Sequence, residues 1–230
     1  MRFPVIVADP PWDFTTYSDK AQKSAKQHYR TMSLFDIANL PVSDVAADVC
    51  CLLLWATWPN LEDALTVGAA WGFSYKTCAF NWIKRSGNGT SWHTGLGYYT
   101  RSNSEPCLLF TRGGTPQRQH KDVHQVLVSD DAVQPLPGFE EVLTSPVAAH
   151  SEKPGDFYFR VERLLQGPYL ELFSRRYRPG WVTLGNELDG LDIADSLKRV
   201  ATDQPLPILK ENYHAVIESQ SLREGRRHGE

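Results

Sequence analysis

Short apolar runs alternate with amphipathic segments along most of this sequence. Apolar runs bounded by turn-forming residues predict buried strands, and apolar positions that recur every three or four residues predict helices. The predicted strands cover residues 5–8, 50–56, 75–83, 107–110, 123–128, 169–173 and 181–184. The predicted helices cover residues 33–40, 59–71, 154–165 and 193–200. This alternation predicts an α/β fold with a mostly parallel sheet.

Residues with strong preferences at helix ends support several of these boundaries. Ser33 is a suitable N-cap, and Pro41 ends the helix that follows it. Pro59 suits the first turn of the next helix, which Gly72 ends. The segment 154–165 places its apolar residues on one face, as a helix packed against a sheet requires.

The chain of 230 residues is long enough for one compact domain with a substantial core. We predict that residues 1–203 form this domain and that residues 204–230 are a polar C-terminal extension, partly disordered. Long loops are predicted at 14–30, 86–99 and 134–149. Loops of this length on a rigid sheet often carry binding functions.

Composition narrows the class of protein. No apolar run is long enough to cross a membrane, and the first residues lack a signal-peptide pattern, so we expect a cytoplasmic location. The four cysteines, Cys50, Cys51, Cys78 and Cys107, form no C-x-x-C pair. Their apolar surroundings predict buried free thiols and no metal site.

The charge distribution is uneven. The formal net charge is −3, whereas most nucleic-acid binders carry a basic footprint. Positive charges nevertheless gather in local clusters that are compatible with phosphate contacts. These clusters are Lys20, Lys23, Lys26 and Arg30; Lys84 and Arg85; Arg112, Arg118 and Lys121; and Arg175, Arg176 and Arg178.

The strongest chemical signal is the tetrapeptide Asp9-Pro10-Pro11-Trp12, directly after the first predicted strand. Neither proline can donate to a β-ladder, and each favours an extended conformation in the residue before it. A carboxylate, a stiff turn and an aromatic ring are therefore placed at the carboxyl end of a central strand. Ligands of open α/β sheets bind beyond these strand ends.

This arrangement suits chemistry at an exocyclic amine on a planar ring, which is a poor nucleophile because its lone pair is delocalised. The Asp9 carboxylate and the Pro10 carbonyl can accept hydrogen bonds from the two N–H groups, and Trp12 can stack on the ring. The stiff turn holds these acceptors in place before the reaction. The alternative is a strand-ending turn with a buried Trp that has no catalytic role.

Further short motifs follow in a consistent order. They are Tyr29-Arg30-Thr31-Met32-Ser33, Leu53-Leu54-Trp55, Asn81-Trp82-Ile83-Lys84, Arg101-Ser102-Asn103-Ser104-Glu105, Glu152-Lys153-Pro154, Glu171-Leu172-Phe173 and the run from Trp181 to Gly190. Together with the opening tetrapeptide, this series resembles the adenine-N6 methyltransferases typified by the catalytic subunit of the eukaryotic messenger-RNA methyltransferase, with their bacterial and phage relatives. The resemblance spans residues 3–191.

The resemblance implies a Rossmann-like fold with the catalytic motif ahead of the cofactor segment, and S-adenosylmethionine as cofactor. The implied catalytic residues are Asp9, Pro10, Pro11 and Trp12. The implied cofactor-binding residues are Asp9, Lys153, Arg175, Tyr177, Asn186 and Glu187. The implied target-base pocket consists of Trp12, Tyr29, Trp82 and Glu105. One departure is Ser174, which stands where relatives often carry Gly, so the backbone approach to the cofactor is expected to differ there.

We therefore predict methylation of the exocyclic N6 amine of adenine in DNA, with the base taken out of its stack. DNA is favoured because no RNA-binding domain is appended to this short chain. The alternatives are RNA as substrate, a catalytically silent nucleic-acid-binding partner subunit, and transfer to cytosine N4 or a glutamine amide. The sequence leaves open a homodimer or a heterodimer.

Overall fold

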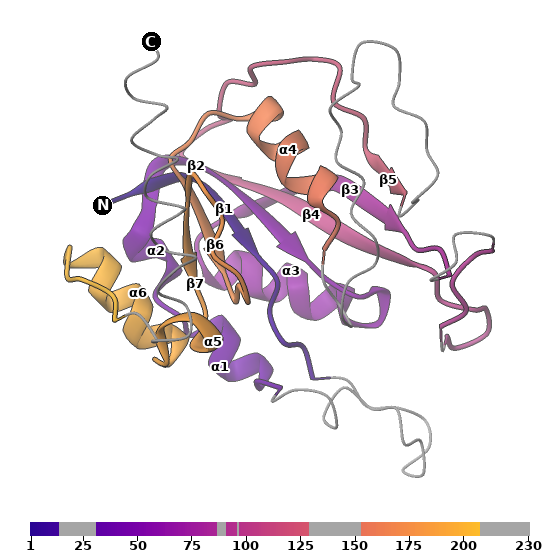
Figure 1. Cartoon of the computed structure of the whole chain (residues 1–230), viewed down its shortest axis with the longest axis horizontal. Helices are drawn as coiled ribbons and strands as arrows, with labels where there is room; N and C mark the ends of the chain where they lie inside the picture. The colour runs from indigo at the N-terminus through magenta and orange to yellow at the C-terminus, as the bar shows by residue number, and fades with distance from the viewer. Residues whose placement is uncertain (14–30, 87–90, 96, 129–152, 208–230) are drawn as a thin grey trace. The chain divides into compact units, whose positions relative to one another are not determined.

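The computed structural model describes residues 1–13, 31–86, 91–95, 97–128 and 153–207 (Figure 1). Within these residues the chain forms two compact units. The first unit comprises Met1–Thr77, Leu108–Pro116 and the residues from Gly167 onward. The second unit comprises Cys78–Cys107 and Gln117–Gln166.

Strands of the described residues are hydrogen-bonded in the order β5-β3-β4-β2-β1-β6-β7. Their bounds are β1 Phe3–Ala8, β2 Ala46–Trp55, β3 Ser74–Ile83, β4 Ser104–Arg112, β5 Val126–Val128, β6 Tyr169–Leu172 and β7 Trp181–Leu184. Strand β1 pairs in parallel with β2 and β6, β6 pairs in parallel with β7, and β3 pairs in parallel with β5. The predicted α/β class with a mostly parallel sheet is confirmed.

The helices connect these strands. Their bounds are α1 Leu34–Ala38, α2 Val42–Val45, α3 Leu61–Ala70, α4 Gly155–Leu164, α5 Asn186–Asp189 and α6 Ile193–Ala201, with a 3-10 turn, η2, at Trp58–Asn60. The Ser33 hydroxyl accepts a hydrogen bond from the Asp36 N–H, so the predicted N-cap is confirmed. Gly72 follows α3 with a φ of 83°, a left-handed conformation that ends a helix without steric cost.

Strand β1 is the centre of the first unit, because it lies between β2 and β6. Its residues from Val5 to Ala8 are each at most 1% exposed. A parallel strand covered on both faces reads as an uninterrupted apolar run. This burial explains why the run was recognisable in the sequence.

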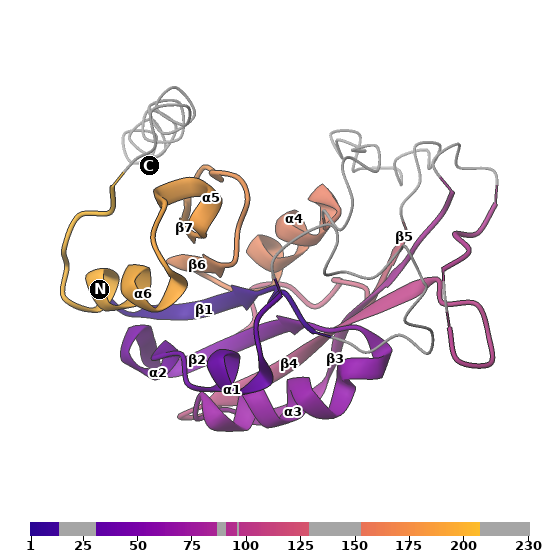
Figure 2. The same cartoon turned by 90° about the horizontal axis from the view of Figure 1, so that it is seen from below.

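Helices α1 and α3 contact each other on one side of β1 and β2 (Figure 2). The buried Trp71 indole N–H donates to the Ile37 carbonyl over 2.9 Å and joins the two helical segments. Gly68 of α3 lies against the Phe110 ring, where an added Cβ would come within 2.2 Å of a ring carbon. The absence of a side chain at Gly68 therefore allows α3 to approach β4.

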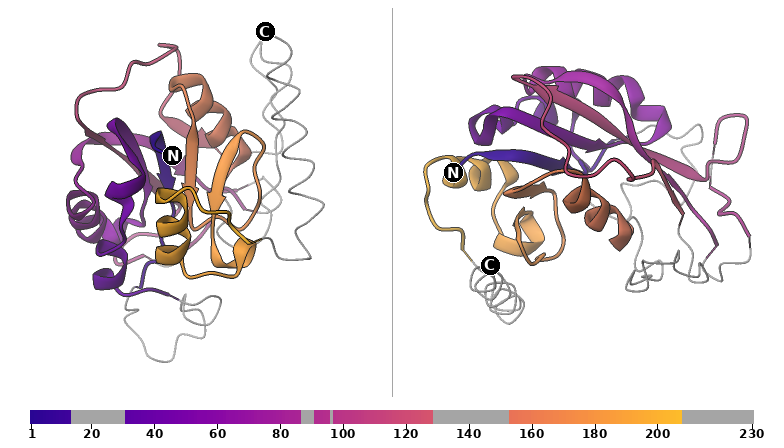
Figure 3. Two further views of the ribbon diagram at one scale, coloured as in Figure 1. Left: turned by 90° about the vertical axis from the view of Figure 1, so that its left-hand side faces the viewer. Right: turned by 90° about the horizontal axis from the view of Figure 1, so that it is seen from above.

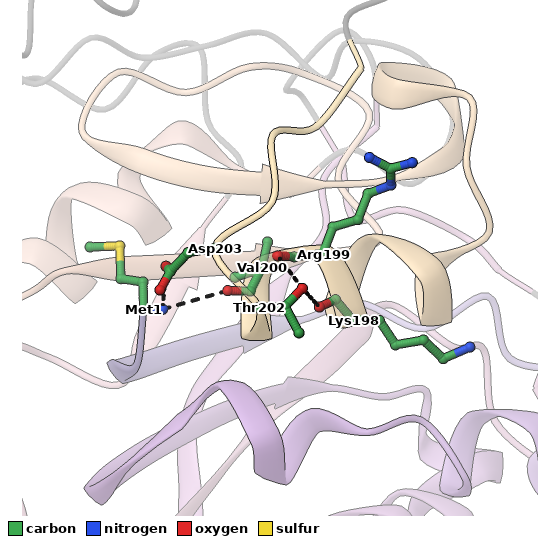
Figure 4. A network of polar contacts seen from close by, with 6 residues as sticks. All are labelled: Met1, Lys198, Arg199, Val200, Thr202 and Asp203. Atoms are coloured by element: carbon green, nitrogen blue, oxygen red, sulfur yellow. Dashed lines mark hydrogen bonds and ion pairs between the residues drawn. The ribbon is translucent and has the colours of Figure 1, made fainter.

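Helix α6 contacts β7, and the first residue of the chain lies at its end (Figure 4). The Met1 amino group contacts the Asp203 carboxylate at 2.7 Å and the Val200 carbonyl at 3.5 Å. The Thr202 hydroxyl donates to the Lys198 carbonyl over 2.8 Å, and the same carbonyl accepts the Thr202 N–H over 3.1 Å at the end of the helix.

In the second unit, α4 packs against the strands that precede it. The Phe157 ring meets Phe80 of β3 edge to face, with centroids 5.4 Å apart. The Arg160 guanidinium donates to the carbonyls of His124 and Val126 over 2.8 and 2.9 Å. One side chain of α4 thereby holds the short strand β5 in place.

Several boundaries differ from the sequence prediction. Strand β2 begins four residues before Cys50, at Ala46, and β5 covers only the last part of the predicted 123–128 strand. Helices α2 and α5 were not predicted, because each has only four residues and shows no helical period. The predicted C-terminal extension is untested, since residues 208–230 lie outside the described part of the chain.

Three of the cysteines, Cys50, Cys51 and Cys107, are buried free thiols as predicted, whereas Cys78 is half-buried. Burial raises the pKa of Cys50 and that of Cys51 to about 12. Neither thiol is therefore a nucleophile at neutral pH. Among the described residues, no helix combines the length and the apolar character that a membrane crossing needs.

Candidate active site

Asp9 lies directly after β1, at a position where several strands end level with one another. Ala8, the last residue of β1, pairs with Leu54 on β2 and with Leu172 on β6, and Leu172 pairs with Leu184 on β7. The residues that follow these strands share one edge of the sheet (Figure 3). The strand order changes direction at β1, because β2 lies on one side and β6 on the other. Such an edge is where open α/β sheets bind ligands.

Backbone hydrogen bonds fold Asp9–Trp12 into a tight turn. The Trp12 N–H donates to the Pro10 carbonyl over 2.8 Å, and the Met32 N–H donates to the Pro11 carbonyl over 3.0 Å. The Asp9 N–H donates to the last carbonyl of β6 over 3.4 Å. Pro10 is buried and Asp9 is half-buried. Hydrogen bonds to β6 and to Met32 therefore hold the turn in place, and the Asp9 side chain extends from a fixed backbone.

The Trp12 side chain anchors this turn. It is only 6% exposed, and its indole N–H donates to the Trp55 carbonyl at the end of β2 over 2.9 Å. The burial fits the alternative interpretation of Trp12 as a structural residue. Its stacking on a target base stays a prediction.

Asn60 binds the backbone of Asp13, the residue after the Asp9–Trp12 turn. Asn60 was not selected as a site residue from the sequence. The side chain is buried, and its amide nitrogen donates to the Asp13 carbonyl over 3.1 Å. Its amide oxygen accepts from the Thr57 hydroxyl over 2.6 Å. The only sequence signal for Asn60 was its place in the first turn of the predicted helix 59–71, and the pairing with Asp13 depends on how β1 and β2 lie side by side.

The carboxyl end of β6 turns sharply toward β7. Phe173 has a φ of 64°, in the left-handed region that non-glycine residues rarely adopt. The Ser174 N–H then donates to the Leu184 carbonyl over 2.9 Å. A Cβ on Gly185 would lie 2.0 Å from the Ser174 carbonyl oxygen. The segments after β6 and β7 thus approach each other closely because Gly185 has no side chain.

Three of the predicted cofactor residues lie on these two segments with exposed side chains: Arg175, Asn186 and Glu187. The Arg175 Nε and a Glu187 carboxylate oxygen are 3.9 Å apart, with side chains 46% and 60% exposed. Such an exposed pair contributes about 0–1 kcal/mol to stability. A ligand that separated the two groups would therefore cost the fold little.

Tyr177 is more firmly bound to the protein. Its hydroxyl donates to the Leu188 carbonyl over 3.0 Å. Burial, and then the negative charge of Asp189, raise the pKa of the Tyr177 phenol above its ordinary value. Tyr177 is therefore a neutral hydrogen-bonding group at physiological pH.

In the second unit, a carboxylate lies between two ammonium groups. Glu105, at the start of β4, forms an ion pair with Lys84 and a second one with Lys153, whose Nζ is 3.4 Å from the other carboxylate oxygen. The side chains of Glu105 and Lys153 are 15% and 5% exposed. Burial by itself would raise the pKa of Glu105, but the charges on Lys153 and Lys84 outweigh it and lower that pKa. The cluster of Glu105, Lys84 and Lys153 therefore carries a net positive charge and is mostly buried.

Trp82 belongs to the same cluster. Its side chain is 3% exposed, and the Lys84 Nζ lies 4.7 Å from the centre of its ring. In the sequence Lys84 belonged to a basic cluster and to the motif Asn81-Trp82-Ile83-Lys84, and it was given no role in the site. The structure shows that it joins two predicted pocket residues, Trp82 and Glu105.

The predicted site residues thus fall into two groups. In the first unit the structure gathers Asp9, Pro10, Pro11, Trp12, Arg175, Tyr177, Asn186 and Glu187 on segments that follow β1, β6 and β7. In the second unit it gathers Trp82, Glu105 and Lys153. Tyr29, the remaining residue of the predicted pocket, lies outside the described residues.

A rigid Asp-Pro-Pro-Trp turn at the switch point of a parallel sheet, with polar groups after the neighbouring strands, is typical of an α/β protein with a ligand site at its strand ends. The chain belongs to the MT-A70 family, whose profile matches residues 3–187. This membership confirms the resemblance found in the sequence.

Individual relatives agree with this assignment. The Type II methyltransferase M.MunI of Mycoplasma sp is 30% identical over 205 residues, which cover 81% of this chain and 78% of that protein. The human N(6)-adenosine-methyltransferase catalytic subunit METTL3 is 29% identical over 84% of this chain and 30% of its own length. The human N(6)-adenine-specific methyltransferase METTL4 is 28% identical, over 81% of this chain and 37% of its own length.

Proposed function

We propose that this chain transfers a methyl group from S-adenosylmethionine to the N6 amine of adenine in DNA. The observation that carries the proposal is the Asp9–Trp12 turn, fixed by backbone bonds at the carboxyl edge of β1 in an MT-A70 chain. Relatives in this family are named as N6-adenine and N6-adenosine methyltransferases.

The turn would act on the amine by accepting its hydrogen bonds. Asp9 is half-buried, so an amine N–H that donates to its carboxylate competes with less water than at an exposed residue. The Pro10 carbonyl already accepts the Trp12 N–H, and a carbonyl oxygen has a second lone pair for the other N–H of the amine. Both acceptors belong to one rigid segment, so they need little reorganisation during the reaction.

The residues of the first unit fit S-adenosylmethionine by their chemistry. The exposed Glu187 and Asn186 offer acceptors and donors for sugar hydroxyls, and Arg175 adds a cation nearby. Because Gly185 has no side chain, the backbone before Asn186 lies directly against the backbone of Ser174. The cofactor supplies an electrophilic methyl group on a positively charged sulfur, so the protein mainly orients and desolvates the amine.

The cluster of the second unit has the charges that anionic or polar groups of a ligand would need. Lys153 is a nearly buried cation, suited to a carboxylate or a phosphate oxygen. Glu105, kept ionised by Lys84 and Lys153, is suited to accept hydrogen bonds from a base edge. These roles, like the pocket role of Trp82 and Tyr29, are part of the proposal.

DNA is proposed as the substrate because M.MunI, a type II methyltransferase, matches most of this chain over most of its own length. RNA is the second candidate, favoured by the likeness to METTL3. Matched DNA and RNA oligonucleotides of one sequence, with radiolabelled S-adenosylmethionine as donor, separate the two. We expect label in DNA, and label in RNA alone would overturn the choice of substrate.

The catalytic role is tested with Asp9→Asn, which keeps the size of the side chain and removes its charge. We expect kcat to fall on the order of 100- to 1000-fold, the usual effect of losing one preorganised group. The control is Asp13→Asn, which removes an exposed carboxylate four residues further on. Near wild-type activity of Asp9→Asn would contradict the proposal, and so would failure of the wild-type chain to bind S-adenosylmethionine by calorimetry.

A further inference from the structure

We propose that the loop between β3 and β4 is a docking surface for an unpaired stretch of the DNA strand that carries the target adenine. The proposal concerns the described residues 84–86, 91–95 and 97–103 of the second unit, named the aromatic loop below. It rests on the proposed function and adds to it a contact outside the reacting groups.

Hydrogen bonds give the aromatic loop a defined shape. The His93 N–H donates to the Lys84 carbonyl over 3.0 Å, and the Lys84 N–H donates to the Asn103 carbonyl over 2.8 Å. The Gly95 N–H donates to the Ser102 carbonyl over 2.9 Å. The loop thus continues the pairing of β3 and β4, and its side chains project from a fixed backbone.

Aromatic side chains project from this backbone into solvent. Tyr99 is 94% exposed, Tyr98 is 76% exposed and Trp92 is 54% exposed. The Tyr98 and Tyr99 rings meet edge to face, with centroids 5.0 Å apart. At the base of their turn, a Cβ on Gly97 would come within 1.9 Å of the Thr100 carbonyl oxygen. The turn that presents the two tyrosines therefore requires glycine at position 97.

The charge of the aromatic loop has one sign. The sequence from Lys84 to Ser104 contains three cationic residues, Lys84, Arg85 and Arg101, and no Asp or Glu, although the whole chain has a net charge of −3. Lys84 is paired with Glu105 of β4, so Arg85 and Arg101 are the cations offered to phosphates here. The Arg85 guanidinium lies 5.0 Å from the centre of the Trp92 ring. Cations thus stand before and after the exposed aromatic rings along one segment.

This combination fits a single nucleic-acid strand better than a protein partner. Bases stack on exposed aromatic rings whatever their sequence, and phosphates seek nearby cations. A second copy of this chain is a poor partner on charge alone, because it would bring an identical positive loop to a symmetric interface. The target base must also leave its stack, which leaves unpaired nucleotides on the strand that carries it.

The experiment measures binding of the full chain to a fluorescein-labelled single-stranded DNA by anisotropy at several salt concentrations. The test variant is Tyr98→Ala/Tyr99→Ala, and the ring-preserving variant is Tyr98→Phe/Tyr99→Phe. The matched control is Phe35→Ala, since Phe35 is 75% exposed in the first unit beside an acidic residue, Asp36. Circular dichroism confirms that each variant is folded.

We expect the double Ala variant to raise Kd by about 5- to 100-fold, in line with the loss of stacking on one base. The Kd values of the Phe variant and of the Phe35→Ala control should stay within about twofold of the wild-type value, because neither change removes an aromatic ring of the loop. Arg101→Ala should weaken binding and lower the salt slope by about one. At saturating DNA, kcat of the double Ala variant should equal that of wild type.

An unchanged Kd of the double Ala variant would overturn the inference, and so would a wild-type chain that does not bind the oligonucleotide. A variant that alters sedimentation of the protein without altering Kd would show self-association at the loop and would also overturn it. Loop-dependent binding without methyl transfer by the wild-type chain would support the docking surface and remove the proposed catalytic function. The two proposals can therefore fail separately.

Discussion

The indole nitrogen of Trp12 lies 2.9 Å from the carbonyl oxygen of Trp55, in a buried hydrogen bond that joins the turn after β1 to the end of β2. The bond connects residues 43 positions apart, and the first of them follows Asp9 by three positions. The position of the Asp9 carboxylate therefore depends on the Trp12 side chain, whose ring is buried and whose N–H is hydrogen-bonded inside the protein.

Replacement of Trp12 by Phe should impair both stability and catalysis. The variant leaves the buried Trp55 carbonyl without this donor and a small cavity beside it, at a cost of about 1–3 kcal/mol in the free energy of unfolding. Urea denaturation measures this loss, and kcat should fall with it because the turn loosens. Trp71→Phe is the control, because its equally buried indole donates to Ile37 over 2.9 Å. A comparable fall in kcat for Trp71→Phe would contradict a specific role for Trp12.

Replacement of Asn60 by Ala should likewise loosen the turn. The Asp13 carbonyl and the Thr57 hydroxyl each lose a partner, so we expect a destabilisation of about 1–3 kcal/mol and a lower kcat/KM. Asn39→Ala is the matched variant, since the Asn39 amide donates to a carbonyl in an exposed place. If both variants behaved alike in steady-state kinetics, Asn60 would have no positioning role.

Gly185→Ala should be more harmful than substitution of a glycine in open space. Its Cβ would meet the Ser174 carbonyl oxygen at 2.0 Å, so the segments after β6 and β7 would have to separate. We expect weaker S-adenosylmethionine binding by calorimetry together with a lower melting temperature. Gly180→Ala meets no atom within 4 Å, and its φ of 82° alone should cost about 1–2 kcal/mol. Unchanged cofactor affinity in Gly185→Ala would count against this segment as part of the site.

The lowered pKa of Glu105 predicts a pH-dependent contribution to stability. At acidic pH the unfolded chain binds the proton on this group more readily than the folded chain does. The contribution is therefore complete above the unfolded pKa, about 4.3, and is lost as the pH falls through the lower folded pKa. Denaturant unfolding of wild type and Glu105→Gln from pH 7 to pH 3 should show a stability difference that shrinks toward acid. A difference that grew on acidification would refute the assignment of the ionised form.

The local pattern of apolar residues was sufficient to predict the strands and helices that bury one face or both. The apolar run before Asp9 predicted a central strand, and Ser33 and Gly72 marked helix ends that the structure confirms. Short elements escaped prediction, because α2 and α5 have too few residues to show a period. The motif series was sufficient to identify the family without a structure.

What the sequence by itself determined is the chemistry at the end of β1: an acid, a proline-stiffened turn and a tryptophan are consecutive residues, so no tertiary contact was needed to place them together. Only the tertiary structure decided which groups that are distant in the sequence meet within each unit. Asn60 meets Asp13, and Glu105 meets both Lys84 and Lys153, through contacts that no local spacing encodes. The physical reason is that a strand's pattern specifies which face it buries, whereas register and packing of the whole sheet specify its neighbours.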